Sequence, residues 1–65
     1  MTAKDTRQLA IGTFVFCTVY AVRGWYRVLA IRPRDGYIRI EGYGMWCPPH
    51  NFSTVDSEGR LYSAY

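Results

Sequence analysis

The side chains with the clearest chemical potential in this chain are arginines that alternate with aromatic residues in its middle third. Arginine binds carboxylate or phosphate in a bidentate manner and stacks on rings, and an exposed tryptophan beside an arginine is typical of a binding hot spot. Only Asp35 and Glu41 oppose these arginines locally. The pattern predicts a binding surface formed by Arg23, Trp25, Arg27, Arg32, Arg34, Tyr37, Arg39 and Tyr43.

Several occupants fit such a surface. An acidic protein would pair with the guanidinium groups, whereas a nucleic acid would be contacted through its phosphates and stack its bases on the rings. Self-association through an exposed strand edge and surplus aromatic side chains is a third alternative. A hairpin kept soluble by its charge explains the same arginines without any partner. The net charge of +3 is too small to decide among these interpretations.

Metal and catalytic chemistry find little support. Cys47 and His50 have the spacing of half a zinc site and Cys17 could be a third ligand, but a fourth is missing. A nucleophile needs a base within hydrogen-bond reach and a third, orienting group, and the chain has no marked trio of this kind. The prediction is a non-enzymatic protein with no metal and no cofactor. A site built between barrels in a symmetric oligomer is neither supported nor excluded.

The length of the chain predicts one small domain. A core formed by 65 residues is short of interior, and aromatic side chains suit it because each buries much surface. Two cysteines are too few for a disulfide scaffold, so free, buried thiols are favoured over a disulfide. Free thiols in turn favour a reducing, cytoplasmic compartment. The apolar run Leu9–Val22 is interrupted and too short to span a bilayer, so no membrane contact is expected.

β-branched and aromatic residues in short runs, separated by glycine and proline, predict an all-β chain. An Asp-Gly turn at 35–36 joins the second and third strands. Phe52 and Trp46 are expected in the core, and Trp25 outside it. The expected strands cover residues 13–22, 25–31, 37–41, 45–47 and 53–55, with a helical turn at 48–52. The expected organisation is a flexible leader at 1–8, a barrel at 9–58, and a short final strand or tail at 59–65.

The segment Pro49-His50-Asn51-Phe52, which follows a glycine hairpin, resembles the Pro-x-Asn-aromatic turn of the Src-homology-3-like (SH3-like) barrels. Compact, aromatic-rich chains of this kind are similar to small barrel proteins of bacteria and their mobile elements. The resemblance implies a five-stranded SH3-like barrel with a short helical turn before its last strand, and carries over to Pro49, Asn51 and Phe52. Peptide-binding members have a long acidic first loop and a tryptophan where Tyr37 stands, so their proline-peptide groove is not expected. Because many such barrels act only by docking, a protein partner is the preferred interpretation and nucleic acid the alternative.

Overall fold

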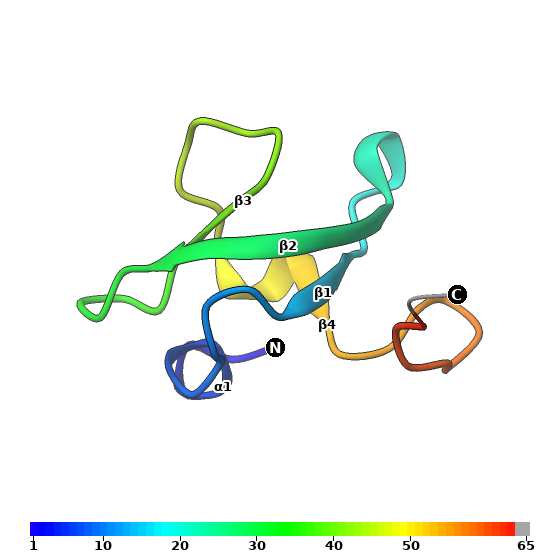
Figure 1. Ribbon diagram of the computed structural model, residues 1–65, viewed down its shortest axis with the longest axis horizontal. Helices are drawn as coiled ribbons and strands as arrows, with labels where there is room; N and C mark the ends of the chain where they lie inside the picture. The colour runs from blue at the N-terminus through cyan, green and yellow to red at the C-terminus, as the bar shows by residue number, and fades with distance from the viewer. Residues whose placement is uncertain (64–65) are drawn as a thin grey trace.

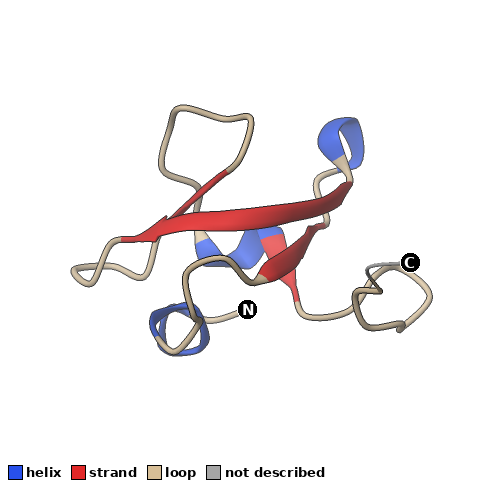
Figure 2. Cartoon of the chain, in the orientation of Figure 1, coloured by secondary structure: helices blue, strands red, loops and turns tan. Residues whose placement is uncertain are grey.

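The computed structural model describes residues 1–63 and shows an antiparallel sheet of four strands with little helix (Figures 1 and 2). The strands lie in the order β3-β2-β1-β4, which agrees with the predicted all-β class, but residues 1–63 form four strands in an open sheet rather than five in a closed barrel. Their bounds are Phe14–Cys17 (β1), Gly24–Ile31 (β2), Ile38–Ile40 (β3) and Phe52–Ser53 (β4). The short helices are α1 (Ala3–Arg7) and two 3₁₀ turns, η1 (Tyr20–Val22) and η2 (Pro49–Asn51).

β2 is the long central strand on which the other elements are arranged (Figure 1). Its first half pairs with β1, from Cys17 opposite Gly24 to Phe14 opposite Arg27. Its second half pairs with β3, and the register shifts between Val28 and Ala30. A shift of this kind adds a residue to one strand and bends it. β2 therefore curls the sheet around the apolar face that forms the core.

The core takes alternate residues from the strands, because successive side chains of a strand point to opposite faces. Val15 and Cys17 face inward from β1, and Ile38 and Ile40 from β3. The other buried members of the cluster are Val28 and Phe52. Phe52 therefore lies in the core as expected from the sequence.

The strand expected over 13–22 is shorter in the structure and ends at Cys17. Thr18 leaves the ladder with β2: its backbone N–H and its hydroxyl both donate to the carbonyl oxygen of Asn51. The chain then enters η1, where the Val22 N–H donates to the Val19 carbonyl. The high β propensity of the second half is overridden by these contacts with distant residues, as propensity often is.

The strand expected at 45–47 is reduced to a single bridge between Cys47 and Ile38. The helical turn expected at 48–52 is η2, and the strand expected at 53–55 starts one residue earlier and is only two residues long. No strand follows within residues 59–63, and the last part of the 59–65 segment lies outside the described residues.

The segment expected as a flexible leader contains α1 in the structure. Thr2 caps its N-terminus, because the Thr2 hydroxyl accepts from the Asp5 N–H and the Asp5 carboxylate accepts from the Thr2 N–H. Thr6 is completely buried against the turn between β2 and β3. A helix of five residues shows no measurable periodicity in the sequence, which is why it was not expected. None of the helices within residues 1–63 has the length and apolar character needed to cross a membrane.

Candidate functional site

Two guanidinium groups and two aromatic rings come together beside the β2–β3 hairpin. The Arg32 guanidinium carbon lies 5.1 Å from the centre of the Tyr37 ring and 5.1 Å from the centre of the Trp46 ring. The Arg39 guanidinium carbon lies 5.9 Å from the Trp46 ring centre. All three distances fall within the range of cation–π attraction. Arg32, Tyr37, Arg39 and Trp46 are called the guanidinium–aromatic patch below.

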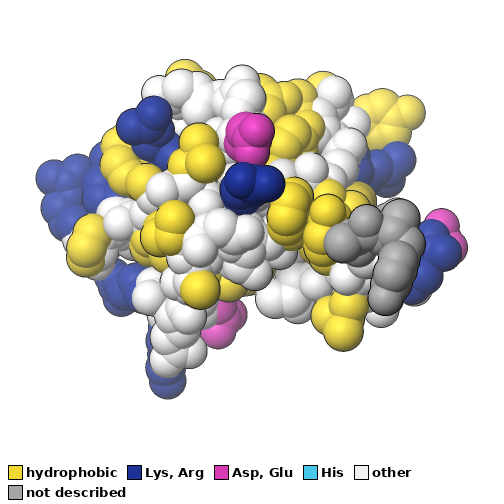
Figure 3. Space-filling view, viewed as in Figure 1, with side chains coloured by type: hydrophobic (Ala, Val, Ile, Leu, Met, Phe, Trp, Pro, Cys, Tyr) yellow, Lys and Arg dark blue, Asp and Glu magenta, His cyan; other side chains and the backbone are white. Residues whose placement is uncertain are grey.

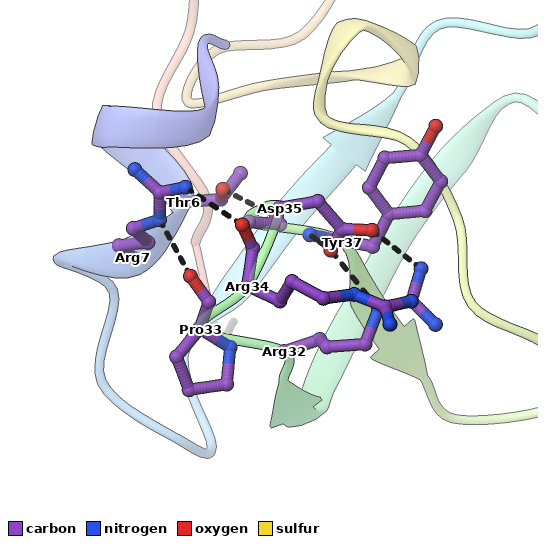
Figure 4. Close-up of polar contacts among 8 residues, drawn as sticks. Thr6, Arg7, Arg32, Pro33, Arg34, Asp35 and Tyr37 are labelled. Carbon is purple, nitrogen blue, oxygen red and sulfur yellow. Dashed lines mark hydrogen bonds and ion pairs between the residues drawn. The ribbon is translucent and has the colours of Figure 1, made fainter.

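Arg32 is held in place by Asp35 and is the positioned member of the patch (Figure 4). Its Nε donates to Asp35 Oδ1 at 3.0 Å and its Nη2 to Asp35 Oδ2 at 2.6 Å. These hydrogen bonds, helped by the Tyr37 N–H, lower the pKa of Asp35 from 3.8 to about 2. The same pair raises the pKa of Arg32. The charge of Arg32 is thus neutralised within the hairpin, and its guanidinium group lies close to both rings.

α1 holds the turn that carries this pair (Figure 4). The Arg7 Nε donates to the Pro33 carbonyl at 2.9 Å, and its Nη2 to the Arg34 carbonyl at 3.2 Å. The buried Thr6 hydroxyl donates to the carbonyl of Gly36. Each contact is made to a backbone oxygen of the turn, so the helix fixes the path of the chain rather than any one side chain.

Three arginines of this region form no ion pair with an acidic residue within residues 1–63: Arg7, Arg34 and Arg39. The Arg7 guanidinium group donates to two carbonyl oxygens of the turn, whereas the exposed side chains of Arg34 and Arg39 have no carboxylate partner. Lys and Arg side chains gather at the end of the molecule that carries the β2–β3 hairpin, on the left of Figure 3. Arg60 by contrast lies 3.4 Å from Asp56 and 3.2 Å from Glu58 in the C-terminal segment. The β2–β3 hairpin therefore carries exposed positive charge that no acidic side chain of residues 1–63 neutralises.

Other residues of the predicted surface lie away from the patch. Arg27 lies 3.7 Å from Glu41 and above the Phe14 ring, on the outer face of the sheet. Trp25 lies on the same face, edge-on to Phe16 with ring centres 5.4 Å apart. These residues belong to an aromatic layer that also holds Tyr62.

Arg23 and Tyr43 are placed elsewhere again. Arg23 follows η1 and lies over the exposed Tyr20 ring. Tyr43 packs on the margin of the core, edge-on to Tyr26 with ring centres 5.6 Å apart. The neighbouring Tyr43 hydroxyl, and to a smaller extent burial, raise the pKa of Tyr26. Of the predicted set, only Arg32, Arg34, Tyr37 and Arg39 lie on or beside the patch.

Trp46 is the patch residue that sequence reasoning missed, because it was expected in the core. It is half-buried and does not belong to the core cluster. The bridge between Ile38 and Cys47 explains its position: Cys47 packs on the core, so its neighbour Trp46 faces outward, as Arg39 does beside Ile38. Side chains alternate between the two faces of a strand, so an inward-facing Cys47 would have predicted that Trp46 faces outward.

The half zinc motif is not assembled. Within residues 1–63, no three His, Cys, Asp or Glu side chains are grouped as a metal ion would require. His50 is exposed on η2. Burial, and to a smaller extent Cys17, raises the pKa of the Cys47 thiol, which is the opposite of what an activated nucleophile needs.

Comparison of the chain with protein-family models, with curated proteins and with solved structures finds no match. The geometry of the patch is therefore the basis for assigning a function.

Proposed function

We propose that this chain is a small non-enzymatic binding module that docks an acidic segment of a protein partner on the guanidinium–aromatic patch. The observation that carries the proposal is the half-buried Trp46 ring, which has the guanidinium groups of Arg32 and Arg39 at 5.1 Å and 5.9 Å. Tryptophan and arginine are the residues that dominate binding energy at protein interfaces. Arg39 supplies a charge that no carboxylate in the described chain neutralises.

Preorganisation supports this choice of surface. The Arg32–Asp35 pair and the α1 contacts hold the hairpin before any partner arrives. Ordering side chains at an interface opposes binding by about 0.5–1.5 kcal/mol for each rotamer-rich group. Arg32 is already held by Asp35 and lies close to two rings, so ordering its side chain on binding costs little free energy.

We also propose that the fold is an SH3-like barrel with Cys47 as the remnant of a fourth strand and β4 as the fifth. Cys47 pairs with Ile38 at one edge of the sheet, and Phe52 pairs with Cys17 near the other. η2 connects these two positions and comes directly before β4, where the Pro-x-Asn-aromatic segment lies. The order of pairing supports the resemblance noted in the sequence.

The test is an amide and indole NMR titration of the labelled chain with a hexaglutamate peptide that carries one tryptophan. We expect shifts at the Trp46 indole N–H and at the amides around Arg39, with weaker binding at higher salt. Arg39→Gln should weaken binding about tenfold, equivalent to about 1.4 kcal/mol. Arg60→Gln is the matched control, because Arg60 already has two carboxylate partners.

Two outcomes would count against the proposal: shifts confined to other surfaces, or equal losses in the Arg39→Gln and Arg60→Gln variants. If the peptide titration supports the patch, a natural partner can be sought by affinity capture with the wild-type chain and the Trp46→Ala variant side by side. A genuine ligand of the patch is retained by the first and lost by the second.

Nucleic acid is the second candidate, and the alternation of rings and guanidinium groups favours it because bases stack on such surfaces. Two phosphates are the number expected to be neutralised here, since Arg39 is the unpaired cation of the patch and Arg34 is an exposed, unpaired cation of the adjacent turn within residues 1–63. Each neutralised phosphate of a single strand contributes about −0.7 to the slope of log K against log salt. A slope near −1.4, and single-stranded DNA binding tighter than the peptide, would favour nucleic acid.

A further inference from the structure

Two thiols line one cavity at the end of the core, away from the guanidinium–aromatic patch. The cavity has a volume of about 140 Å³. Most of its wall is apolar, with Asn51 and the Tyr43 ring completing it. Its lining residues are Cys17, Val19, Val22, Ile40, Tyr43, Cys47, Asn51 and Phe52.

The backbone brings the two cysteines to this cavity from opposite parts of the sheet. Cys17 ends β1 and is paired with Phe52, and Cys47 is paired with Ile38. η2 is the short connection between Cys47 and Phe52, so both cysteines lie at the ends of the η2 segment. Both are free thiols, Cys17 buried and Cys47 partly exposed. Cys47 packs against the core cluster that contains Cys17.

We propose that Cys17 and Cys47 form a two-coordinate binding site for a soft, thiophilic metal ion of the Cu(I) class. Thiolates select soft ions, and a closed-shell ion such as Cu(I) is satisfied by two sulfur ligands in a line. Structural zinc needs four ligands, and residues 1–63 assemble no group of three. The wall beside the two thiols is mainly apolar, so it offers few oxygen ligands of the kind that harder ions prefer.

The binding step involves no change of oxidation state. Copper enters as Cu(I), two copper–sulfur bonds form, and the two S–H bonds break with release of two protons to solvent. The bound ion joins β1 to the segment before η2. Because the unfolded chain does not hold the two sulfurs together, binding stabilises the folded state by mass action.

Nearby residues offer a competing ligand set that has to be separated from this one. His50 follows Cys47 by three positions but does not line the cavity, and the Met45 side chain is exposed. The Cys47 thiol also lies 3.6 Å from the Met45 carbonyl oxygen. His50→Ala and Met45→Leu are therefore the matched controls for Cys47→Ala.

The experiment is an anaerobic titration of the full chain with Cu(I) against a chromophoric Cu(I) chelator, followed by ultraviolet absorption and thermal unfolding. We expect one ion per chain, thiolate-to-copper absorption and a rise in Tm. Cys47→Ala should weaken binding by about 100-fold or more and abolish the Tm rise, which corresponds to about 2.7 kcal/mol lost. The His50→Ala and Met45→Leu variants should bind as the wild type does. Because Cys17 is buried, its variant is Cys17→Ala, used only if its NMR spectrum is native.

Four results would each overturn the assignment. These are equal Cu(I) binding by Cys47→Ala, loss of binding in His50→Ala, one ion per two chains, and Zn²⁺ binding as tight as Cu(I). A disulfide formed in the copper-free sample, seen as a mass lower by two hydrogens, would also overturn it and assign the pair to redox chemistry. None of these outcomes bears on the peptide titration of the patch, so the two proposals fail independently.

Discussion

The Thr6 hydroxyl donates a hydrogen bond to the Gly36 carbonyl across 30 positions of sequence, and so joins the N-terminal helix to the β2–β3 turn. Thr6 is completely buried by this contact. The same turn carries Asp35, which fixes Arg32 between its two rings. The geometry of the guanidinium–aromatic patch therefore depends on a helix that contributes no side chain to the patch.

Gly36→Ala should destabilise the chain strongly. Gly36 has φ +75°, and an added Cβ would lie 2.7 Å from the Ala3 backbone and from the Thr6 hydroxyl oxygen. Backbone strain of about 1–3 kcal/mol adds to this overlap, so we expect a loss of about 3 kcal/mol or more in urea denaturation. Gly42→Ala is the control, because Gly42 has φ +96° but open space around it. If Gly36→Ala and Gly42→Ala lowered the free energy of unfolding equally, close packing of α1 against the turn would be contradicted.

Ile38→Val should lower the free energy of unfolding by about 0.5–1.5 kcal/mol, because it removes a buried methyl group and leaves a small cavity. Ile38 is fully buried in the cluster around Phe52. The matched control is Ile11→Val, since Ile11 is 61% exposed and should change by no more than about 0.5 kcal/mol. Denaturant midpoints of both variants measure the difference, and a larger loss at Ile11 would contradict the location of the core.

Asp35 should make the stability of the chain depend on acidity. The pKa of Asp35 is about 2 in the folded chain, against the ordinary value of 3.8 that applies to the unfolded chain. The ionised carboxylate therefore stabilises the fold. This contribution is complete above about pH 4 and is lost as the pH falls through about 2. Denaturation of wild type and Asp35→Asn between these limits should show a gap that closes toward low pH. A gap that does not vary with pH would exclude the ion pair as its cause.

Arg32→Lys should raise the pKa of Asp35 toward 3.8, because the hydrogen bond from Arg32 is the largest cause of the lowered value. Lysine cannot form the paired contact to both carboxylate oxygens, and its ammonium lacks the planar group with which arginine stacks on rings. The carboxyl carbon chemical shift of Asp35 followed against pH measures the change. Arg34→Lys is the control, since Arg34 makes only a minor contribution to the same pKa.

Period-two alternation and turn residues determined which segments are strands. Ile38 and Ile40 alternate with Arg39, and β3 has this inward and outward pattern. The Pro33–Gly36 turn ends β2 at the expected residue, Ile31, because proline and a tight turn interrupt a ladder locally, and β2 begins at Gly24, one residue before the expected start. Such signals depend on neighbouring residues only, and for that reason they can be read from the sequence.

Contacts between distant segments decided the remaining features. Thr18 leaves the ladder because Asn51 accepts its hydrogen bonds, and α1 is held by Gly36. The arginines that alternate in the sequence separate in space: Arg27 pairs with Glu41, and Arg39 lies over Trp46. No local pattern encodes these pairings, because each depends on how the curled sheet brings remote residues together. The sequence by itself thus determined a small β-rich chain with an arginine and aromatic hairpin, and only the tertiary structure decided which of those residues share a surface.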